Sequence, residues 1–265
     1  MTLEQAIALG ALQGATEFLP VSSSGHLALA QSLISGFTQP GVLFDVLLHV
    51  GTMIAVIIYF CKDLRDLATA PFRRDETAGQ HQKMLLLLIA GSVPTGIIGL
   101  AGKDFAESLF ENVPVVACML LITGTILFVS ERLRRGTGSG KTDIGWGDAI
   151  ITGIAQGLAI IPGISRSGST IATLLLRGVD GELAARFSFL LALPAVFGAT
   201  LLSLRDIGEV AAGQLVTYAA GTGAAMVIGL LSIHFLLAII RRKRLYFFAF
   251  YCWAVGALFL TLSLT

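Results

Sequence analysis

The sequence has little charge. Asp, Glu, Lys and Arg make up only 13% of its 265 residues, hydrophobic residues make up 55%, and the formal net charge is +1. Soluble domains carry about 25% charged residues, so this composition excludes an ordinary soluble protein. The near-zero net charge also argues against nucleic acid or a highly charged partner, because no large field of one sign is available. A mean hydropathy of +0.82 instead predicts an integral membrane protein.

Cysteine is scarce, and the N-terminus lacks the basic start of a secretory signal. The three cysteines, Cys61, Cys118 and Cys252, lie in or beside separate apolar segments without metal-ligand spacing. We expect them to be small packing residues and not a disulfide set. The first eleven residues carry Glu4 and no basic side chain, so we expect this segment to be retained.

Long apolar runs, in contrast, are abundant. A helix needs about 20 apolar residues to cross the ~30 Å hydrocarbon core of a bilayer. Six segments approach or exceed that length, namely 42–60, 84–101, 113–129, 183–204, 215–240 and 247–264. The sequence therefore predicts an all-α polytopic membrane protein that forms a single membrane domain.

Two further segments, both interrupted by Pro, Ser and Gly, repeat each other. The stretch "QGATEFLPVSSSG" (13–25) aligns without a gap with "QGLAIIPGISRSG" (156–168), and in the same register "FDVLLHV" (44–50) aligns with "FSFLLAL" (187–193). We therefore divide the chain into a first repeat (1–131), a Gly-rich linker (132–145) and a second repeat (146–265). Three crossings follow each interrupted segment, so the second repeat is inverted if those segments do not cross, and inverted repeats place binding sites near the membrane midplane.

The basic residues test whether the interrupted segments cross. If both are re-entrant hairpins, most basic residues gather on one side of the membrane: Lys62, Arg65, Arg73, Arg74, Lys83, Arg132, Arg134, Arg135, Lys141, Arg177 and the run 241–244. Only Lys103 and Arg205 then lie on the other side. Full crossing would move the run 241–244 away from the earlier basic loops, against the positive-inside bias. We therefore predict six spanning helices and two re-entrant hairpins, the first entering from outside and the second from the cytoplasm, with both chain ends outside.

The hairpin tips are suited to binding an anion. Irregular backbone survives at membrane depth only where it is buried in protein or lines a wet cavity. In each hairpin a new half-helix begins near Gly25 or Gly168, and its free N–H groups and positive dipole end attract phosphate. Two such helix starts facing each other would form a phosphate site.

Three side chains add chemistry to these tips. Arg166 stands at the turn of the second hairpin, where its planar guanidinium suits a two-point phosphate contact; the alternative is an ion pair with Glu17 of the first hairpin. Gln13 and Glu17 are four residues apart and share a helix face, so their oxygens could hold a divalent cation. Alternatively, they only cap the hairpin backbone.

The first hairpin also carries a candidate nucleophile. Ser23 and His26 are three residues apart, which allows contact at a helix start, and a hydroxyl beside an imidazole is a minimal activated nucleophile. The imidazole alone could also act as a general acid or base. The second hairpin has other residues at the positions of Glu17, Ser23 and His26, namely Ile160, Arg166 and Ser169. The remaining polar residues within the spans are expected to be structural: His49, Ser92, Thr95, Thr123, Ser188 and His234.

Both motifs resemble a known family. The stretch "QGATEFLPVSSSGH" is similar to an (E/Q)xxxE pattern followed by PVSSxGH, and "PGISRSG" is similar to PGxSRSG. Together they resemble the undecaprenyl-pyrophosphate phosphatases of the bacitracin-resistance type, and the similarity extends over nearly the whole chain. The resemblance implies a multi-pass enzyme of the bacterial inner membrane, with its active site facing outside, that hydrolyses undecaprenyl pyrophosphate to the monophosphate carrier used in cell-wall synthesis.

The resemblance also assigns roles. Glu17 is expected to be essential, with Gln13 at the first motif position, and Ser23 or His26 is the nucleophile or its activator. Phosphate is expected to be held by Arg166 and by a set of small residues at the tips: Ser22, Ser24, Gly25, Ser165, Ser167 and Gly168. A divalent metal, Mg²⁺ or Ca²⁺, is implied, although the neutral amide of Gln13, where many members carry Glu, removes a second charged ligand. A homodimer is compatible with the sequence. A different class of function, a transporter or flippase of an anionic isoprenyl phosphate lipid, is also compatible with an inverted repeat.

Overall fold

The computed structural model describes residues 1–34, 42–75, 77–110, 112–134, 140–203 and 214–264. Within these ranges the chain is helical, and its only β contact is an isolated bridge between Lys141 and Val179. The all-α prediction is confirmed. The helices are α1 (Leu3–Phe18), α2 (Ser23–Leu33), α3 (Val42–Tyr59), α4 (Cys61–Thr69), a 3₁₀ turn (Ala70–Phe72), α5 (Ala78–Leu109), α6 (Val113–Arg134), α7 (Trp146–Leu158), α8 (Arg166–Leu176), α9 (Gly181–Ser203), α10 (Leu215–Arg241) and α11 (Tyr246–Leu264).

Five of these helices, α5, α6, α9, α10 and α11, are long and apolar enough to cross a membrane. The sixth predicted span, 42–60, qualifies only together with α4, from which α3 is bent by 75°. Helix α4 carries two pairs of charged residues, Lys62 with Asp63 and Arg65 with Asp66, so it is suited to a membrane surface and not to hydrocarbon. The protein is therefore a multi-pass membrane protein.

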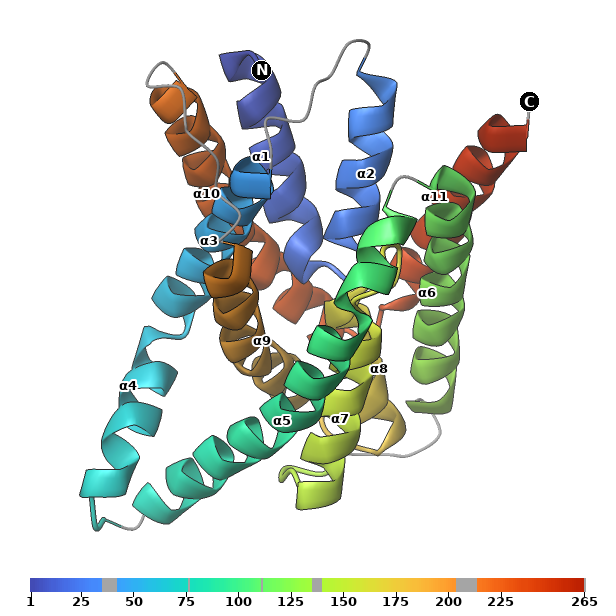
Figure 1. Ribbon diagram of the computed structural model, residues 1–265. Coiled ribbons are helices and arrows are strands. Elements are labelled where there is room, and N and C mark those ends of the chain that lie inside the picture. The colour runs from blue at the N-terminus through green and yellow to red at the C-terminus, as the bar shows by residue number, and fades with distance from the viewer. Residues whose placement is uncertain (35–41, 76, 111, 135–139, 204–213, 265) are drawn as a thin grey trace.

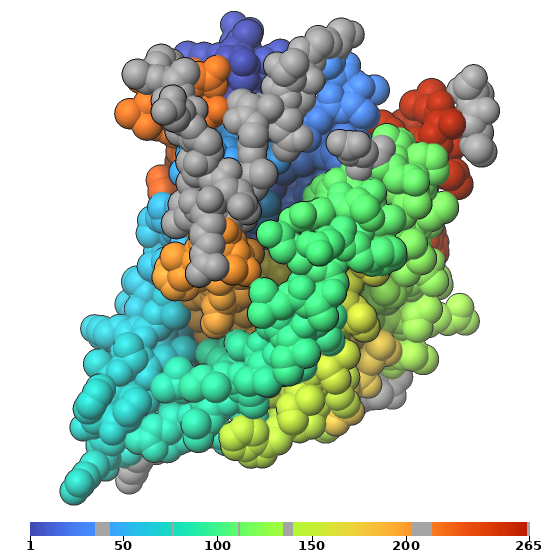
Figure 2. Space-filling model, viewed as in Figure 1, coloured from blue at the N-terminus to red at the C-terminus, as the bar shows by residue number. Residues whose placement is uncertain are grey.

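Helix α5 is longer than a single membrane crossing requires. With 32 residues it is about 48 Å long at 1.5 Å per residue, well above the ~30 Å of the hydrocarbon core. It accordingly crosses the molecule obliquely, as its teal-to-green course in Figure 1 and Figure 2 shows. Large apolar side chains along its outer face, such as Ile97 (64% exposed) and Leu100 (63%), are exposed in the monomer and are covered by lipid tails in a bilayer.

The two interrupted segments form hairpins of two short helices each, α1 with α2 and α7 with α8. Figure 1 shows the first hairpin entering from the end that carries both chain termini and the second from the opposite end, with the two tips meeting between them. The starts of α5 and α7 and the end of α6, which lie beside most of the predicted basic residues, are at the end opposite to the termini. Arg135 and Arg205 lie outside the described residues, as does the stretch 135–139 of the predicted linker, whose first three residues continue α6.

Each hairpin packs against a long helix of the other half through glycine. A Cβ atom on Gly10 of α1 would lie 2.1 Å from the carbonyl oxygen of Gly221 in α10, and one on Gly153 of α7 would lie 2.0 Å from that of Gly91 in α5. One turn further on, the contact is again repeated: Gly14 meets Ile228, and Gly157 meets Ile98. Gly10 and Gly153 are equivalent in the sequence repeat. Both hairpins therefore pack against their long helices in the same way.

An aromatic cluster lies next to the hairpin tips. Phe18, the last residue of α1, is almost fully buried and contacts Phe189 of α9 edge to face, with ring centroids 5.5 Å apart. Phe60, at the bend between α3 and α4, contacts Phe189 from another side at 6.0 Å. Because Phe18 directly follows Glu17, this packing fixes the backbone that carries the carboxylate.

Candidate active site

The turn at each hairpin tip is closed by a serine that caps the next helix. Ser22 accepts a hydrogen bond from the backbone N–H of Gly25 at 3.3 Å, and Ser165 accepts one from Gly168 at 3.0 Å. Ser22 has a φ of 69°, a strained value for a residue with a side chain. The first residues of the new helices are then Ser23 in α2 and Arg166 in α8. These two residues occupy equivalent positions in the repeat, and each is the first residue of its helix.

The two tips touch each other. Ser167 donates through its hydroxyl to the carbonyl oxygen of Leu19 at 3.2 Å, which ties the second hairpin to the first. A Cβ atom on Gly25 would lie 3.1 Å from the Cα atom of Gly163, and one on Gly168 would lie 3.3 Å from the Cβ atom of Pro20. The motif glycines therefore allow the two helix starts to approach each other closely.

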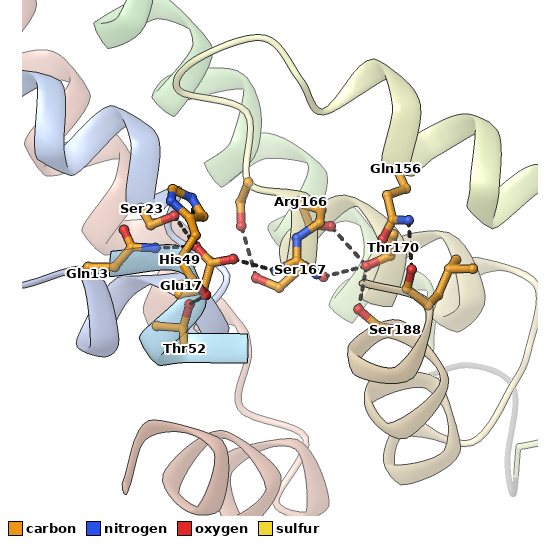
Figure 3. A network of polar contacts seen from close by, with 12 residues as sticks. Gln13, Glu17, Ser23, His49, Thr52, Gln156, Arg166, Ser167, Thr170 and Ser188 are labelled. Atoms are coloured by element: carbon orange, nitrogen blue, oxygen red, sulfur yellow. Dashed lines mark hydrogen bonds and ion pairs between the residues drawn. The ribbon is translucent and has the colours of Figure 1, made fainter. Parts of the chain in front are cut away.

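Glu17 is the centre of the site, and residues of both hairpins converge on it (Figure 3). Arg166 Nη2 donates to Glu17 Oε1 at 2.5 Å, Ser23 Oγ donates to Oε2 at 2.5 Å, and Gln13 Nε2 donates to Oε2 at 3.0 Å. The ion pair across the repeat, which the sequence left as an alternative for Arg166, is present. The Glu17 side chain is only 6% exposed and that of Arg166 17% exposed, so the pair is largely shielded from solvent.

Two polar atoms at this centre have no hydrogen-bond partner among the described residues. They are Nη1 of Arg166 and Oε1 of Gln13, and both are buried. An unpaired buried donor or acceptor is costly, so such atoms indicate a place for a ligand, an ion or water. One of these atoms is a donor and the other an acceptor, and they come from opposite hairpins.

The contact between His26 and Ser23 that their spacing allows is not formed. Its Nδ1 lies 2.8 Å from the carbonyl oxygen of Ser22 and its Nε2 lies 2.9 Å from the hydroxyl of Tyr251 in α11. Both ring nitrogens are therefore engaged elsewhere, because the bond to the Ser22 carbonyl turns the ring toward α11. Ser23 uses Glu17 as its acceptor instead.

His49 belongs to the site although the sequence placed it among the structural residues. Its Nε2 lies 3.9 Å from Glu17 Oε2, and its Nδ1 donates to the carbonyl oxygen of Asp45 at 2.8 Å. The repeat contained a signal for this residue: in the aligned second block, His49 stands opposite Ala192, a polar residue against an apolar one. The same comparison had already singled out Glu17, Ser23 and His26.

The equivalent glutamines of the two hairpins behave differently. Gln156 donates to the carbonyl oxygen of Leu191 at 3.1 Å and to the hydroxyl of Thr95 at 3.3 Å, so it fastens α7 to its neighbours. Gln13 donates to Glu17 instead (Figure 3). Behind Arg166, Thr170 donates to its carbonyl oxygen at 2.9 Å. The glutamine of the second hairpin is thus part of the support, whereas that of the first takes part in the site.

A small hollow adjoins the ion pair, and the space in it that a water molecule could enter is ≈ 10 Å³. Glu17 and Arg166 form its polar end, and the other walls are mainly apolar side chains of α1, α3 and α9: Phe18, Thr52, Met53, Val56, Ala192, Leu193 and Val196. A charged group with a long apolar tail would match this division between a polar end and apolar walls.

The residues present can supply only part of a metal coordination shell. Among the described residues, no group of three or more His, Cys, Asp or Glu side chains could hold a metal ion. Glu17 offers one carboxylate, and Gln13 offers the unpartnered Oε1. Oxygen ligands suit Mg²⁺ or Ca²⁺, and Mg²⁺ commonly binds through one or two carboxylates plus substrate phosphates. The donor set therefore fits a metal shared with a phosphorylated substrate.

Comparison with known proteins places this arrangement in a family. The family model described as "Bacitracin resistance protein BacA" matches residues 6–258, a range that includes both hairpins. The chain belongs to this family. Among BacA-type relatives, the undecaprenyl-diphosphatase of Syntrophotalea carbinolica is 57% identical over 99% of this chain and all of its own. Those of Desulforapulum autotrophicum (42% identical, 97% of this chain and 96% of its own) and Alkaliphilus metalliredigens (44%, all of both chains) are also similar over nearly their full lengths.

Proposed function

We propose that this BacA-family protein is an undecaprenyl-diphosphatase. It hydrolyses undecaprenyl pyrophosphate to undecaprenyl phosphate and phosphate, which returns the carrier lipid to cell-wall synthesis and confers bacitracin resistance. One observation carries the proposal: a serine hydroxyl, a carboxylate and a guanidinium meet at two opposed helix N-termini beside an apolar hollow. The family and the names of its relatives agree with this chemistry.

The pyrophosphate binds at the polar end of the hollow, which must open to admit it. Arg166 exchanges part of its contact with Glu17 for the terminal phosphate, to which its unpartnered Nη1 can also donate. Backbone N–H groups at the starts of α2 and α8 add further donors, together with the serines that cap those helices. The isoprenyl tail extends along the apolar walls formed by α3 and α9 and from there into the bilayer.

Ser23 is the proposed nucleophile. Its hydroxyl already donates to Glu17 Oε2, so the carboxylate can accept the proton as Oγ attacks the terminal phosphorus. The new bond is Oγ–P, and the bond that breaks joins this phosphorus to the bridging oxygen, which leaves with undecaprenyl phosphate. Water then attacks the phosphoserine, phosphate departs, and the proton on Glu17 returns to Oγ. Charge neutralisation by Arg166 and the helix starts accounts for most of the acceleration.

A divalent metal, Mg²⁺ or Ca²⁺, is part of the proposal. Glu17 and the Oε1 atom of Gln13 would hold it together with substrate oxygens, and it would neutralise phosphate charge. The proposed location is the bacterial inner membrane, with the basic helix ends in the cytoplasm by the positive-inside bias and the active site accessible from outside.

The test is phosphate release from undecaprenyl pyrophosphate by the purified protein in detergent, with Mg²⁺ or Ca²⁺ and with chelator. Ser23→Ala and Arg166→Gln should each lower kcat/KM by about 100-fold or more, because each removes a group that acts on the transition state. Two matched variants should retain activity. Ser32→Ala removes a hydroxyl that donates to the Leu29 carbonyl of α2, and Arg241→Gln breaks an exposed pair with Glu182.

The opposed hairpins also favour a second candidate, a transporter of an anionic isoprenyl phosphate lipid. The same assay separates the two functions. In one outcome, the wild-type protein releases no phosphate under any metal condition and yet moves the lipid between the leaflets of a vesicle. That result would refute the phosphatase function and support the transporter. Near wild-type turnover by the Ser23→Ala variant would leave the phosphatase function standing but rule out Ser23 as the nucleophile.

A further inference from the structure

Tyr251 of α11 is hydrogen bonded to His26 at the tip of the first hairpin. Its hydroxyl lies 2.9 Å from His26 Nε2, and the two rings are stacked, with centroids 5.5 Å apart and planes inclined by 8°. Tyr251 belongs to neither motif of the repeat, and no pattern in the sequence connects it with His26.

The contacts of His26 determine which nitrogen carries its proton. Nδ1 lies 2.8 Å from the Ser22 carbonyl oxygen, which can only accept a hydrogen bond, so Nδ1 carries the hydrogen. In the neutral ring Nε2 then holds the lone pair, and the Tyr251 hydroxyl donates to it. The ring is thus held in one tautomer and one orientation by a contact at each nitrogen.

Neighbouring residues hold Tyr251 in place. The thiol of Cys252 contacts the carbonyl oxygen of Pro20 at 3.8 Å, and Trp253 donates through Nε1 to the carbonyl oxygen of Leu121 at 3.1 Å. The first contact ties this turn of α11 to the hairpin tip, and the second ties it to α6. The Tyr251 hydroxyl therefore approaches His26 from a fixed helix and not from a loop.

We propose that Tyr251 is a positioning residue of the active site, which holds the His26 ring and, through the bond of Nδ1 to the Ser22 carbonyl, the turn that precedes Ser23. The inference rests on the proposed phosphatase function, in which His26 lies one helical turn from the nucleophile Ser23. A hydroxyl can donate to neutral Nε2 and accept from protonated Nε2, so the same contact keeps the ring in place in either protonation state. Glu17 then holds the Ser23 hydroxyl, while Tyr251 and His26 hold the backbone from which Ser23 projects.

The spectroscopic test uses ¹⁵N-histidine NMR of the full-length protein in detergent. The chain has four histidines, so a His26→Gln variant identifies the His26 signals. The wild type should show Nδ1–H and a hydrogen-bonded, unprotonated Nε2, and Tyr251→Phe should shift the Nε2 signal of His26 alone. Tyr59→Phe is the matched control, because the Tyr59 hydroxyl lies 3.5 Å from Nδ1 of His234, another Tyr–His contact outside the site. A wild-type His26 protonated at Nε2 instead of Nδ1 would overturn the proposal.

The kinetic test compares Tyr251→Phe with wild type in the phosphate-release assay. Loss of one hydrogen bond that holds the turn before Ser23 should lower kcat by about tenfold and leave KM unchanged, whereas Tyr59→Phe should change neither. In a His26→Gln background the Tyr251→Phe change should have no further effect, because Tyr251 acts through His26. A further tenfold loss in that background, or an unchanged kcat in the single variant, would overturn the proposal. An inactive wild type would instead refute the phosphatase function, and the NMR contact could still be measured.

Discussion

At the scale of single residues, the site is organised by the sharing of one carboxylate. Glu17 accepts from Arg166, Ser23 and Gln13 at 2.5 to 3.0 Å, whereas His49 approaches the same carboxylate only to 3.9 Å. The His49 side chain is 34% exposed, and partly exposed pairs of this kind contribute about 1 kcal/mol or less. The four partners of Glu17 should therefore differ widely in how much each contributes to activity.

His49→Gln should lower kcat/KM by less than about fivefold, since 1 kcal/mol corresponds to roughly that factor. Glu17→Gln should lower it by about 100-fold or more, because the amide cannot take the proton of Ser23. Steady-state phosphate release by the two variants under identical metal conditions provides the comparison. Equal losses in both variants would show that His49 takes part directly in the chemistry.

The sequence indicated which residues lie close together better than how they contact one another. The repeat identified Glu17 and Arg166, and the pairing between them was foreseen as an alternative. The bond from Ser23 to Glu17 could not be foreseen, because it spans a turn whose course depends on the positive φ of Ser22. The direction of His26 could not be foreseen either, because its partner lies in the last helix.

At the scale of helices, the glycine crossings determine how closely each hairpin docks. Gly153→Ala would place a methyl group 2.0 Å from the backbone oxygen of Gly91, so α7 and α5 must move apart. Overpacking of this kind costs about 1–3 kcal/mol, and we expect a lower midpoint of thermal unfolding and lower phosphatase activity. Gly99→Ala on α5 is the control, because a Cβ there meets no atom within 4 Å and alanine favours a helix by about 1 kcal/mol. A Gly153→Ala protein as stable as the Gly99→Ala protein would contradict this crossing.

The sequence located the long helices but not their ends. The apolar window 84–101 marks only the part of α5 at hydrocarbon depth, whereas the helix runs from Ala78 to Leu109 because polar residues extend it at both ends. Helix α6 likewise continues from the predicted end at 129 to Arg134. Helix α4 was not predicted, because nine residues give too short a periodic pattern beside a long apolar run.

At the scale of the whole molecule, the two hairpins reach the centre from opposite ends, and both chain termini lie at the end of the first (Figure 1). Because the helix ends near most of the basic residues lie at the other end, the positive-inside bias predicts that this end faces the cytoplasm. A phosphatase with its polar groups midway between the two ends can exclude bulk water from the ion pair and still admit a lipid from the side. The orientation of the chain then decides from which side of the membrane the pyrophosphate is taken.

This orientation predicts the accessibility of two exposed positions at opposite ends. In a background with Cys61, Cys118 and Cys252 replaced by Ala, a cysteine at Glu4 should react with a membrane-impermeant maleimide in intact cells. A cysteine at Gly79, at the start of α5, should react only after the membrane is opened, because the charge bias places it in the cytoplasm. Neither substitution adds or removes a basic residue, so the orienting charges are preserved. Labelling of Gly79→Cys but not Glu4→Cys in intact cells would show the opposite orientation, in which the first hairpin enters from the cytoplasm.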